Sequence, residues 1–209
     1  MDNSKNKIIA IIDYRLNNLN SVKNCLRKMN FDFSIITSED NFIDATHYIL
    51  PGVGSFNLAM RNIKSMKITS RLKDNIIKKK SKILGICLGM QLLFEKSYED
   101  GENVGLGLIK GEVKKLERYK DLNVPNMGWL KTKFTKNDKF LEGIESNSFF
   151  YFVHSYACYV KDKKISLSSL KYKNEFDVII RDDNIFGVQF HPEKSQEPGL
   201  KLLNNFING

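Results

Sequence analysis

The first half of the chain alternates short apolar, β-branched runs with longer stretches whose apolar residues recur at helical spacing. Strand-like runs cover residues 7–13, 33–37, 48–50 and 82–86, helix-like stretches cover 18–29 and 58–80, and a further helix follows residue 87. Strands that alternate with helices are typical of a parallel sheet covered by helices. The pattern therefore predicts an α/β fold.

The second half consists of short strand-like runs joined by turns. These runs cover residues 109–116, 129–134, 149–153, 165–172, 178–181 and 185–190, and a closing helix covers 199–207. We interpret the runs as antiparallel or mixed extensions of the same sheet. Since no linker or repeat divides the chain, we expect residues 1–209 to form one domain. Its predicted architecture is a three-layer αβα sandwich with a mostly parallel central sheet and an antiparallel extension.

Composition restricts the setting of this domain. The three cysteines lack regular spacing, which argues against a disulfide framework and favours a reducing cytoplasm; we assign no role to Cys25 and Cys158. No apolar run is long enough to cross a membrane. The net charge of +9 is spread along the chain without a nucleic-acid motif, so we expect a solvated basic surface and no nucleic-acid partner. A basic binding module remains the non-enzyme alternative.

The run Gly85-Ile86-Cys87-Leu88-Gly89 has the layout of a nucleophile elbow with cysteine in place of serine. The two glycines suit a sharp strand-to-helix turn, because they carry no Cβ that could clash with neighbouring backbone. Such a turn exposes the sulfur above the first turn of a helix, where the helix dipole favours the thiolate. Cys87 is therefore our candidate nucleophile, provided that a base lies nearby.

A candidate base follows an apolar run near the end of the chain, in Gln189-Phe190-His191-Pro192-Glu193. In extended backbone His191 and Glu193 project to the same side, and Pro192 keeps His191 away from helical conformation. A carboxylate orients an imidazole while the other ring nitrogen serves the thiol. The sequence thus predicts a triad of Cys87, His191 and Glu193.

A Pro-Gly-Val-Gly loop at residues 51–54 ends the strand that precedes the elbow. Ligands of α/β sheets bind beyond the carboxyl ends of the strands, where this loop, Cys87 and His191 would meet. We predict that backbone N–H groups of Gly52 and Val53, together with that of Leu88 after the nucleophile, form an oxyanion hole.

Taken together, these motifs resemble the class I glutamine amidotransferases, and more narrowly the glutaminase subunit of imidazole glycerol phosphate synthase, an enzyme of histidine biosynthesis. The similarity spans nearly the whole chain and includes Met90 before Gln91 and the Met-Gly-Trp and Phe-Val-His-Ser-Tyr segments. It implies the flavodoxin-like architecture of that family. It also implies attack of Cys87 on the carboxamide of L-glutamine, with Gly52, Gln91, Glu99 and Ser155 contacting the substrate.

The resemblance further implies a heterodimer, in which ammonia passes to a barrel-shaped cyclase subunit that makes imidazole glycerol phosphate and an aminoimidazole carboxamide ribotide. A cap around residues 125–129 would face that partner. We expect no metal and no cofactor. Trp129 by itself reads as core filler, and His154 as a hydrogen-bonded structural histidine.

Four residues depart from the family's usual pattern. Arg15 and Asn17 replace glycines near the start of the chain, and Asn126 and Leu130 replace a histidine and an asparagine around the Met-Gly-Trp segment. Because the triad is intact, the departures concern the partner. The alternative is a paralogous glutaminase that supplies ammonia to a sugar amidotransferase of surface-polysaccharide biosynthesis. A stand-alone cysteine hydrolase, such as a γ-glutamyl peptidase, is a further possibility.

Overall fold

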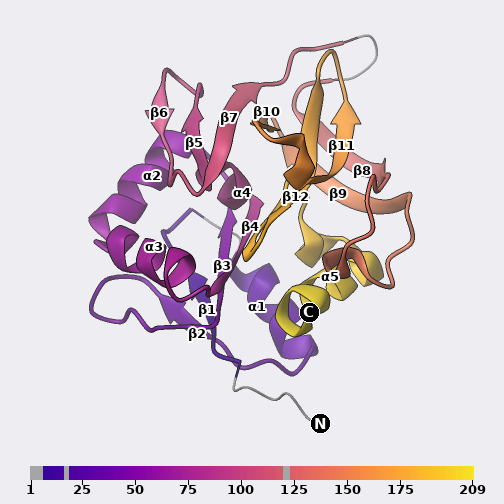
Figure 1. The fold of residues 1–209 in the computed structure, drawn as a ribbon. Helices are drawn as coiled ribbons and strands as arrows, with labels where there is room; N and C mark the ends of the chain where they lie inside the picture. Colours follow the sequence, from indigo (N-terminus) through magenta and orange to yellow (C-terminus); the bar gives the residue numbers. More distant parts are fainter. Residues whose placement is uncertain (1–6, 17–18, 120–122) are drawn as a thin grey trace.

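The computed structural model describes residues 7–16, 19–119 and 123–209 and centres on a mixed eleven-stranded sheet (Figure 1). One half of the sheet is parallel. Its strands, in spatial order, are β2 (Ser34–Ile36), β1 (Ile9–Ile12), β3 (His47–Gly52), β4 (Lys82–Cys87) and β13 (Ile185–Val188). This half matches the predicted strand–helix alternation.

The other half continues from β13 and is mainly antiparallel, which confirms the predicted extension. It contains strands that the sequence pattern did not predict, β5, β6 and β10. In order from β13 its strands are β12 (Glu175–Asp182), β10 (Tyr156–Val160), β7 (Ile109–Lys115), β5 (Phe94–Ser97) and β6 (Asn103–Val104), with β11 (Ser166–Lys171) paired to β12.

Helices cover both faces of the sheet, as the separation of the buried side chains into two clusters shows (Figure 1). Along β1 the buried residues alternate between the clusters, because successive side chains of a strand point to opposite faces. One cluster includes residues of α2 (Phe56–Ser65), α3 (Thr69–Ile77) and α4 (Leu88–Leu92). The other includes residues of α1 (Leu19–Lys28) and α5 (Gln196–Asn208). Short 3₁₀ turns are η1 (Lys139–Leu141), η2 (Lys163–Ile165) and η3 (Pro192–Lys194).

Two predictions about the elements were wrong. The single helix expected over residues 58–80 is two helices, since Lys67 adopts a φ of 57° and a left-handed residue ends a helix. The runs at 129–134 and 149–153 belong to β8 (Asn126–Thr132) and β9 (Ser148–His154), which form a separate two-stranded sheet. Their alternation turns Phe150 and Phe152 into the cluster that includes α1 and α5, so they pack on the main sheet without extending it.

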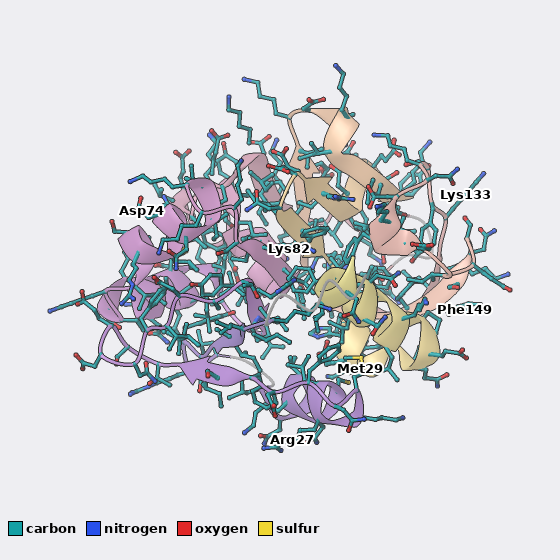
Figure 2. All side chains as sticks on the ribbon, turned by 60° about the horizontal axis from the view of Figure 1, so that its bottom comes forward. Arg27, Met29, Asp74, Lys82, Lys133 and Phe149 are labelled. Atoms are coloured by element: carbon teal, nitrogen blue, oxygen red, sulfur yellow. The ribbon has the colours of Figure 1, made fainter. Side chains whose placement is uncertain are left out.

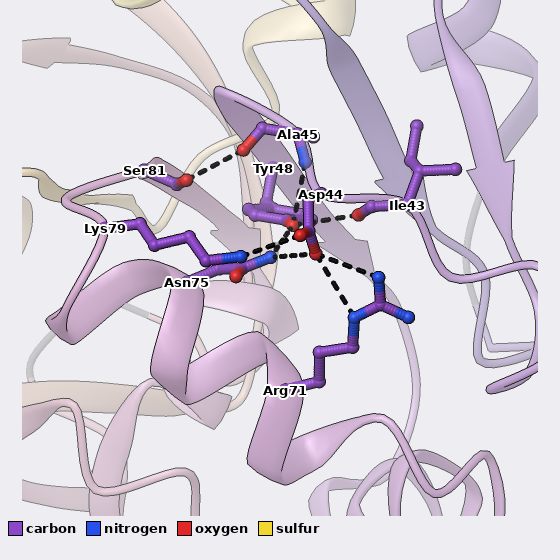
Figure 3. A network of polar contacts seen from close by, with 8 residues as sticks. All are labelled: Ile43, Asp44, Ala45, Tyr48, Arg71, Asn75, Lys79 and Ser81. Carbon is purple, nitrogen blue, oxygen red and sulfur yellow. Dashed lines mark hydrogen bonds and ion pairs between the residues drawn. The ribbon is translucent and has the colours of Figure 1, made fainter.

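A polar network attaches the segment before β3 to α3 (Figure 3). Asp44 accepts hydrogen bonds from Asn75 at 3.0 Å and from Arg71, and it forms an ion pair with Lys79 at 2.7 Å. The Asn75 hydrogen bond, with Lys79 and Arg71, lowers the pKa of Asp44 to about 2. Asn75 also donates to the Tyr48 hydroxyl, so the network reaches into the core.

Basic side chains are distributed around the molecule. In the view of Figure 2, Arg27, Lys82 and Lys133 lie far apart, and long side chains extend from many sides of the outline. This distribution agrees with the expected solvated basic surface.

The start of α4 lies directly on β3, at a distance that only glycine permits. A Cβ on Gly89 would lie 1.6 Å from the carbonyl oxygen of Leu50, and a Cβ on Gly85 would lie 2.7 Å from the backbone of Gly89. The two glycines therefore allow β4 to turn into α4 without separating β3 from β4.

We expect Gly89→Ala to lower the free energy of unfolding by about 3 kcal/mol, because the backbone of β3 or α4 must move to accept the methyl group. Urea unfolding followed by circular dichroism measures this. The exposed helical substitution Asn57→Ala is the control, with an expected effect within about 0.5 kcal/mol. Equal midpoints for the two variants would contradict the steric argument.

Candidate active site

Cys87 is the last residue of β4 and has the strained backbone of a nucleophile elbow. Its φ is 53° and its ψ is −110°, a conformation that costs a non-glycine residue roughly 1–3 kcal/mol. The side chain is 5% exposed. Leu88, the first residue of α4, follows the turn directly, so its N–H belongs to the helix end that carries unpaired donors.

The predicted triad residues meet at one edge of the parallel strands. β4 lies between β3 and β13, Gly52 is in register with Cys87, and His191 follows the end of β13. Nδ1 of His191 lies 2.8 Å from Oε1 of Glu193, and both side chains are buried. The structure thus brings together residues more than 100 positions apart in the sequence.

The imidazole of His191 is set up to hold a proton next to the sulfur. Burial lowers the pKa of His191, but the nearby Cys87 sulfur and the Glu193 carboxylate outweigh burial and raise this pKa to about 10. Nε2 is buried, and it has no hydrogen-bond partner among the residues that the structure describes. Glu193 binds Nδ1 of His191, so Nε2 is the ring nitrogen that can exchange a proton with the Cys87 sulfur.

Ser195, which the sequence reasoning missed, fixes the backbone of His191. Its hydroxyl donates to the carbonyl of His191 at 2.6 Å and accepts from the N–H of Tyr151 at 3.0 Å. The N–H of His191 donates to the carbonyl of Tyr151 at 2.9 Å. The histidine loop is thereby attached to β9.

A pocket of about 340 Å³ lies above Cys87 and takes in most of the predicted substrate residues. Its lining contains Val53, Gly54, Cys87, Leu88, Gln91, Glu99, Pro125, Val153, His154, Ser155 and Tyr156. Glu99 accepts a hydrogen bond from the N–H of Phe56 at 2.8 Å. Burial raises the pKa of Glu99, against the effect of this hydrogen bond. A larger hollow of about 860 Å³ at residues 134–146 contains none of the triad.

The predicted oxyanion loop is present, but one of its donors is engaged elsewhere. The N–H of Val53 donates to the carbonyl of Leu16 at 3.0 Å. A Cβ on Gly52 would lie 1.8 Å from the Tyr14 hydroxyl, which is buried and has no hydrogen-bond partner in the described part of the chain. Burial, and then the charges of Cys87 and Asp13, raise the pKa of Tyr14 well above its usual value. The loop thus rests on Tyr14 and Leu16, neither of which the motifs had indicated.

Three of the four unusual residues have a structural account, and Asn17 lies outside the described residues. Arg15 adopts a φ of 65°, the conformation that the usual glycine would take without strain, and its N–H donates to Asp13 at 2.9 Å. Leu130 packs against the cluster that includes α1 and α5. Asn126 is buried and its Nδ2 lies 2.9 Å from Nε2 of His154.

His154 lines the pocket but is fully hydrogen-bonded, as a structural histidine would be. Its Nδ1 lies 2.8 Å from the carbonyl of Tyr156, which can only accept, so Nδ1 carries the hydrogen and Nε2 accepts from Asn126. Burial lowers the pKa of His154 to about 4. Trp129, in contrast, is 43% exposed, so its interpretation as core filler was wrong.

No cluster of three or more histidine, cysteine, aspartate or glutamate side chains suited to a metal occurs among residues 7–16, 19–119 and 123–209. Over the same ranges no helix is long and apolar enough to cross a membrane. The cysteines at positions 25, 87 and 158 are free thiols.

Comparison with known proteins identifies the family of the chain. A model of the family "Glutamine amidotransferase class-I" matches residues 10–208. The imidazole glycerol phosphate synthase subunit HisH 2 of Methanococcus maripaludis is 45% identical over 201 residues, covering 96% of this chain and 98% of the relative. The HisH subunit of Aquifex aeolicus is 44% identical and covers 94% of each chain. PurLQS of Thermotoga maritima shares the fold, with a TM-score of 0.73 at 19% identity over 97% of this chain and 98% of that one.

The sheet edge and its Cys-His-Glu site define a glutamine amidotransferase enzyme. The chain belongs to the class I glutamine amidotransferase family and, within it, to the HisH subunits of imidazole glycerol phosphate synthase.

The buried His154 predicts a stability that falls in mild acid. Below about pH 6.5 the unfolded chain protonates this histidine and the folded protein does not, so stability decreases as the pH falls from about 6.5 toward 4. At pH 5 the loss attributable to His154 is about 2 kcal/mol. We expect His154→Gln, which keeps a donor and an acceptor, to reduce the difference in unfolding free energy between pH 7 and pH 5 by that amount. An unchanged difference in urea titrations at the two pH values would contradict the assignment.

Proposed function

We propose that this chain is the glutaminase subunit of imidazole glycerol phosphate synthase, with residues 1–209 acting as one domain. It hydrolyses L-glutamine to glutamate and ammonia, and the ammonia passes to a cyclase partner for histidine biosynthesis. The observation that carries the proposal is the buried Cys87–His191–Glu193 site at the foot of the pocket. Since the nucleophile must remain a free thiol, we place the protein in a reducing cytoplasm.

The chemistry follows from the protonation of His191. The Cys87 thiolate attacks the carboxamide carbon of glutamine, and the C–N bond breaks as His191 gives its proton to the departing ammonia. A water molecule then loses a proton to His191 and attacks the thioester, and the C–S bond breaks, which releases glutamate and restores the thiolate–imidazolium pair. Glu193 stabilises the imidazolium in the steps where His191 is protonated, in line with the raised pKa of His191.

Different residues of the pocket would bind different groups of the glutamine substrate. We assign Glu99 to the α-ammonium group, because its carboxylate lies in the pocket at the start of α2. Gln91 and Ser155 supply polar side chains in the same pocket, and Gly52 keeps the loop wall close to Tyr14. The N–H groups of Gly52, Val53 and Leu88 stabilise the oxyanion once Val53 has left the carbonyl of Leu16.

For the partner we propose the outer face of β8 and β9. Met127 is 64% exposed and Trp129 43% exposed, and they lie on one side of β8, with Phe149 exposed on β9. Pro125, just before β8, lines the pocket. This apolar face therefore continues from the mouth of the active site, where a barrel subunit could receive ammonia without loss to water.

Removal of the nucleophile tests the triad. We expect Cys87→Ala to lower glutamine hydrolysis in the complex by about 10⁴-fold or more, and Glu193→Gln by about two to four orders of magnitude. Cys25→Ser is the matched thiol control, since the Cys25 thiol donates to the backbone carbonyl of Glu193 at 3.4 Å and serine keeps that donor. Ammonia release by Cys87→Ala at the wild-type rate would refute the assignment.

The identity of the partner is tested by co-purification and a glutaminase assay. We expect a barrel-shaped cyclase with its acceptor to raise glutamine turnover by about 10²-fold or more, as completion of an oxyanion hole requires. The sugar amidotransferase alternative is supported by Arg15, Asn126 and Leu130, which differ from the usual pattern of the family. It is also supported by the presence of two HisH proteins in Methanococcus maripaludis, which are 45% and 40% identical to this chain. Stimulation by a sugar amidotransferase alone would favour that alternative. Turnover without any partner would favour a stand-alone hydrolase.

A further inference from the structure

Gln189 is a buried polar residue that follows directly after β13 and contacts the nucleophile. Its side chain is 0% exposed, and its backbone N–H donates to the carbonyl of Val178 at 2.9 Å. Nε2 of Gln189 lies 3.8 Å from the sulfur of Cys87. Burial of an amide costs free energy unless its donors and its acceptor form hydrogen bonds. The contacts of the Gln189 side chain therefore indicate what this amide does.

The orientation of this amide follows from a chain of hydrogen bonds. The backbone carbonyl of Tyr156 can only accept, so the group of Gln91 that lies 2.9 Å away is its NH₂. The same NH₂ lies 3.2 Å from Oε1 of Gln189, which must therefore be the oxygen. The thiol of Cys158 also points to this oxygen, at 3.9 Å. Nε2 of Gln189, and not Oε1, is consequently the atom that faces Cys87.

Cys158 supports this orientation in all protonation states of the site. Burial, followed by the charges of Asp177 and Cys87, raises the pKa of Cys158 well above its usual value. Cys158 therefore remains a thiol, and it donates to the same oxygen, Oε1 of Gln189, as Gln91 does.

The sulfur of Cys87 has two such contacts with opposite effects. It lies 3.8 Å from the carbonyl of Val153, an acceptor that favours the thiol. The N–H of Gln189 is a donor and favours the thiolate. Among the described residues, the charge of the Cys87 sulfur acts on the pKa values of His191, Tyr14 and Cys158. Of these three groups only His191 can carry a positive charge. Gln189 is thus the neutral donor that balances the carbonyl of Val153.

We propose that Gln189 is a positioning residue of the glutaminase reaction: its side-chain N–H donates to the Cys87 sulfur and stabilises the thiolate, and Gln91 fixes the direction of that donor. The inference rests on the proposed function, since it concerns the same nucleophile. It gives Gln91 a second task besides lining the substrate pocket, because the loss of its NH₂ frees the amide of Gln189 to rotate.

The test is the pH profile of Cys87 alkylation by iodoacetamide in the full-length chain without glutamine, followed by mass spectrometry of the Cys87 peptide. We expect Gln189→Met, which keeps the volume and removes the donor, to move the alkylation midpoint upward by about one pH unit. We expect kcat in the complex to fall by about tenfold, with KM changed by less than about twofold. Gln91→Met should move the midpoint in the same direction by a smaller amount.

Two further variants separate this effect from loss of packing. Gln189→Glu keeps the shape of the side chain, and its carboxylate beside the sulfur should move the midpoint upward by more than Gln189→Met does. Val178→Ala removes buried methyl groups from the neighbouring strand and no donor, so it should lower stability and leave the midpoint in place.

Wild-type midpoints in both Gln189 variants would overturn the inference, as would an equal shift in Val178→Ala. Failure of the proposed function has a different signature. A glutamine-analogue electrophile would then leave Cys87 of the wild-type protein unlabelled, whereas failure of this inference leaves that labelling intact.

Discussion

The site depends on one close approach of backbone to backbone, the start of α4 against the end of β3. The carbonyl oxygen of Leu50 occupies the space that a Cβ of residue 89 would need, and Gly85 clears the other side of the turn. Cys87, between the two glycines, has the strained backbone of the turn. The close approach also brings the first turn of α4 next to the loop after β3. The N–H of Leu88 therefore lies on the same side of the sheet edge as the loop that we propose for the oxyanion.

The polar contacts around Cys87 follow from that position. Once β4 ends between β3 and β13, the residues after β13 must pass beside the sulfur. Gln189 then lies beneath it, and His191 lies beside it with Glu193 on its far nitrogen. Nearly all of these groups are buried, which makes each unmatched donor or acceptor expensive and each matched one effective. A strained turn in the chain thereby places the thiol of Cys87 beside an imidazole and an amide.

The sequence alone predicted the parts of the molecule whose signals are local. β1, β3, β4 and β13 are buried on both faces and so appear as continuous apolar runs. The proposed triad rests on two short motifs, and its role stays a prediction. The break at Lys67 was missed because lysine gives no sign of a left-handed backbone. The separate β8–β9 sheet was missed because alternation marks a buried face and does not say what covers it.

Other features of the site could not be predicted from the sequence, because they depend on contacts between distant parts of the chain. Gln189 lies two residues before His191 and is polar in an apolar strand, which is a signal of a buried role, but its partner Cys87 is 102 residues away. The hydrogen bond from Val53 to Leu16 joins two backbones and has no side-chain signature at all. The exposure of Trp129 depends on which face of β8 packs inward, and this is decided by the tertiary structure.

The hydrogen bond from Val53 to Leu16 bears on the proposed role of the loop after β3. An oxyanion hole gains its energy from donors that are already free when charge develops, and a donor already paired with a carbonyl must first leave it. Leu16 follows Arg15, whose φ of 65° shows that this segment is held in a conformation that glycine would adopt more easily. A partner that contacts this segment can therefore act on the hydrogen bond of Val53 without touching the triad. Arg15, with its left-handed backbone, lies directly before the residue that accepts this hydrogen bond.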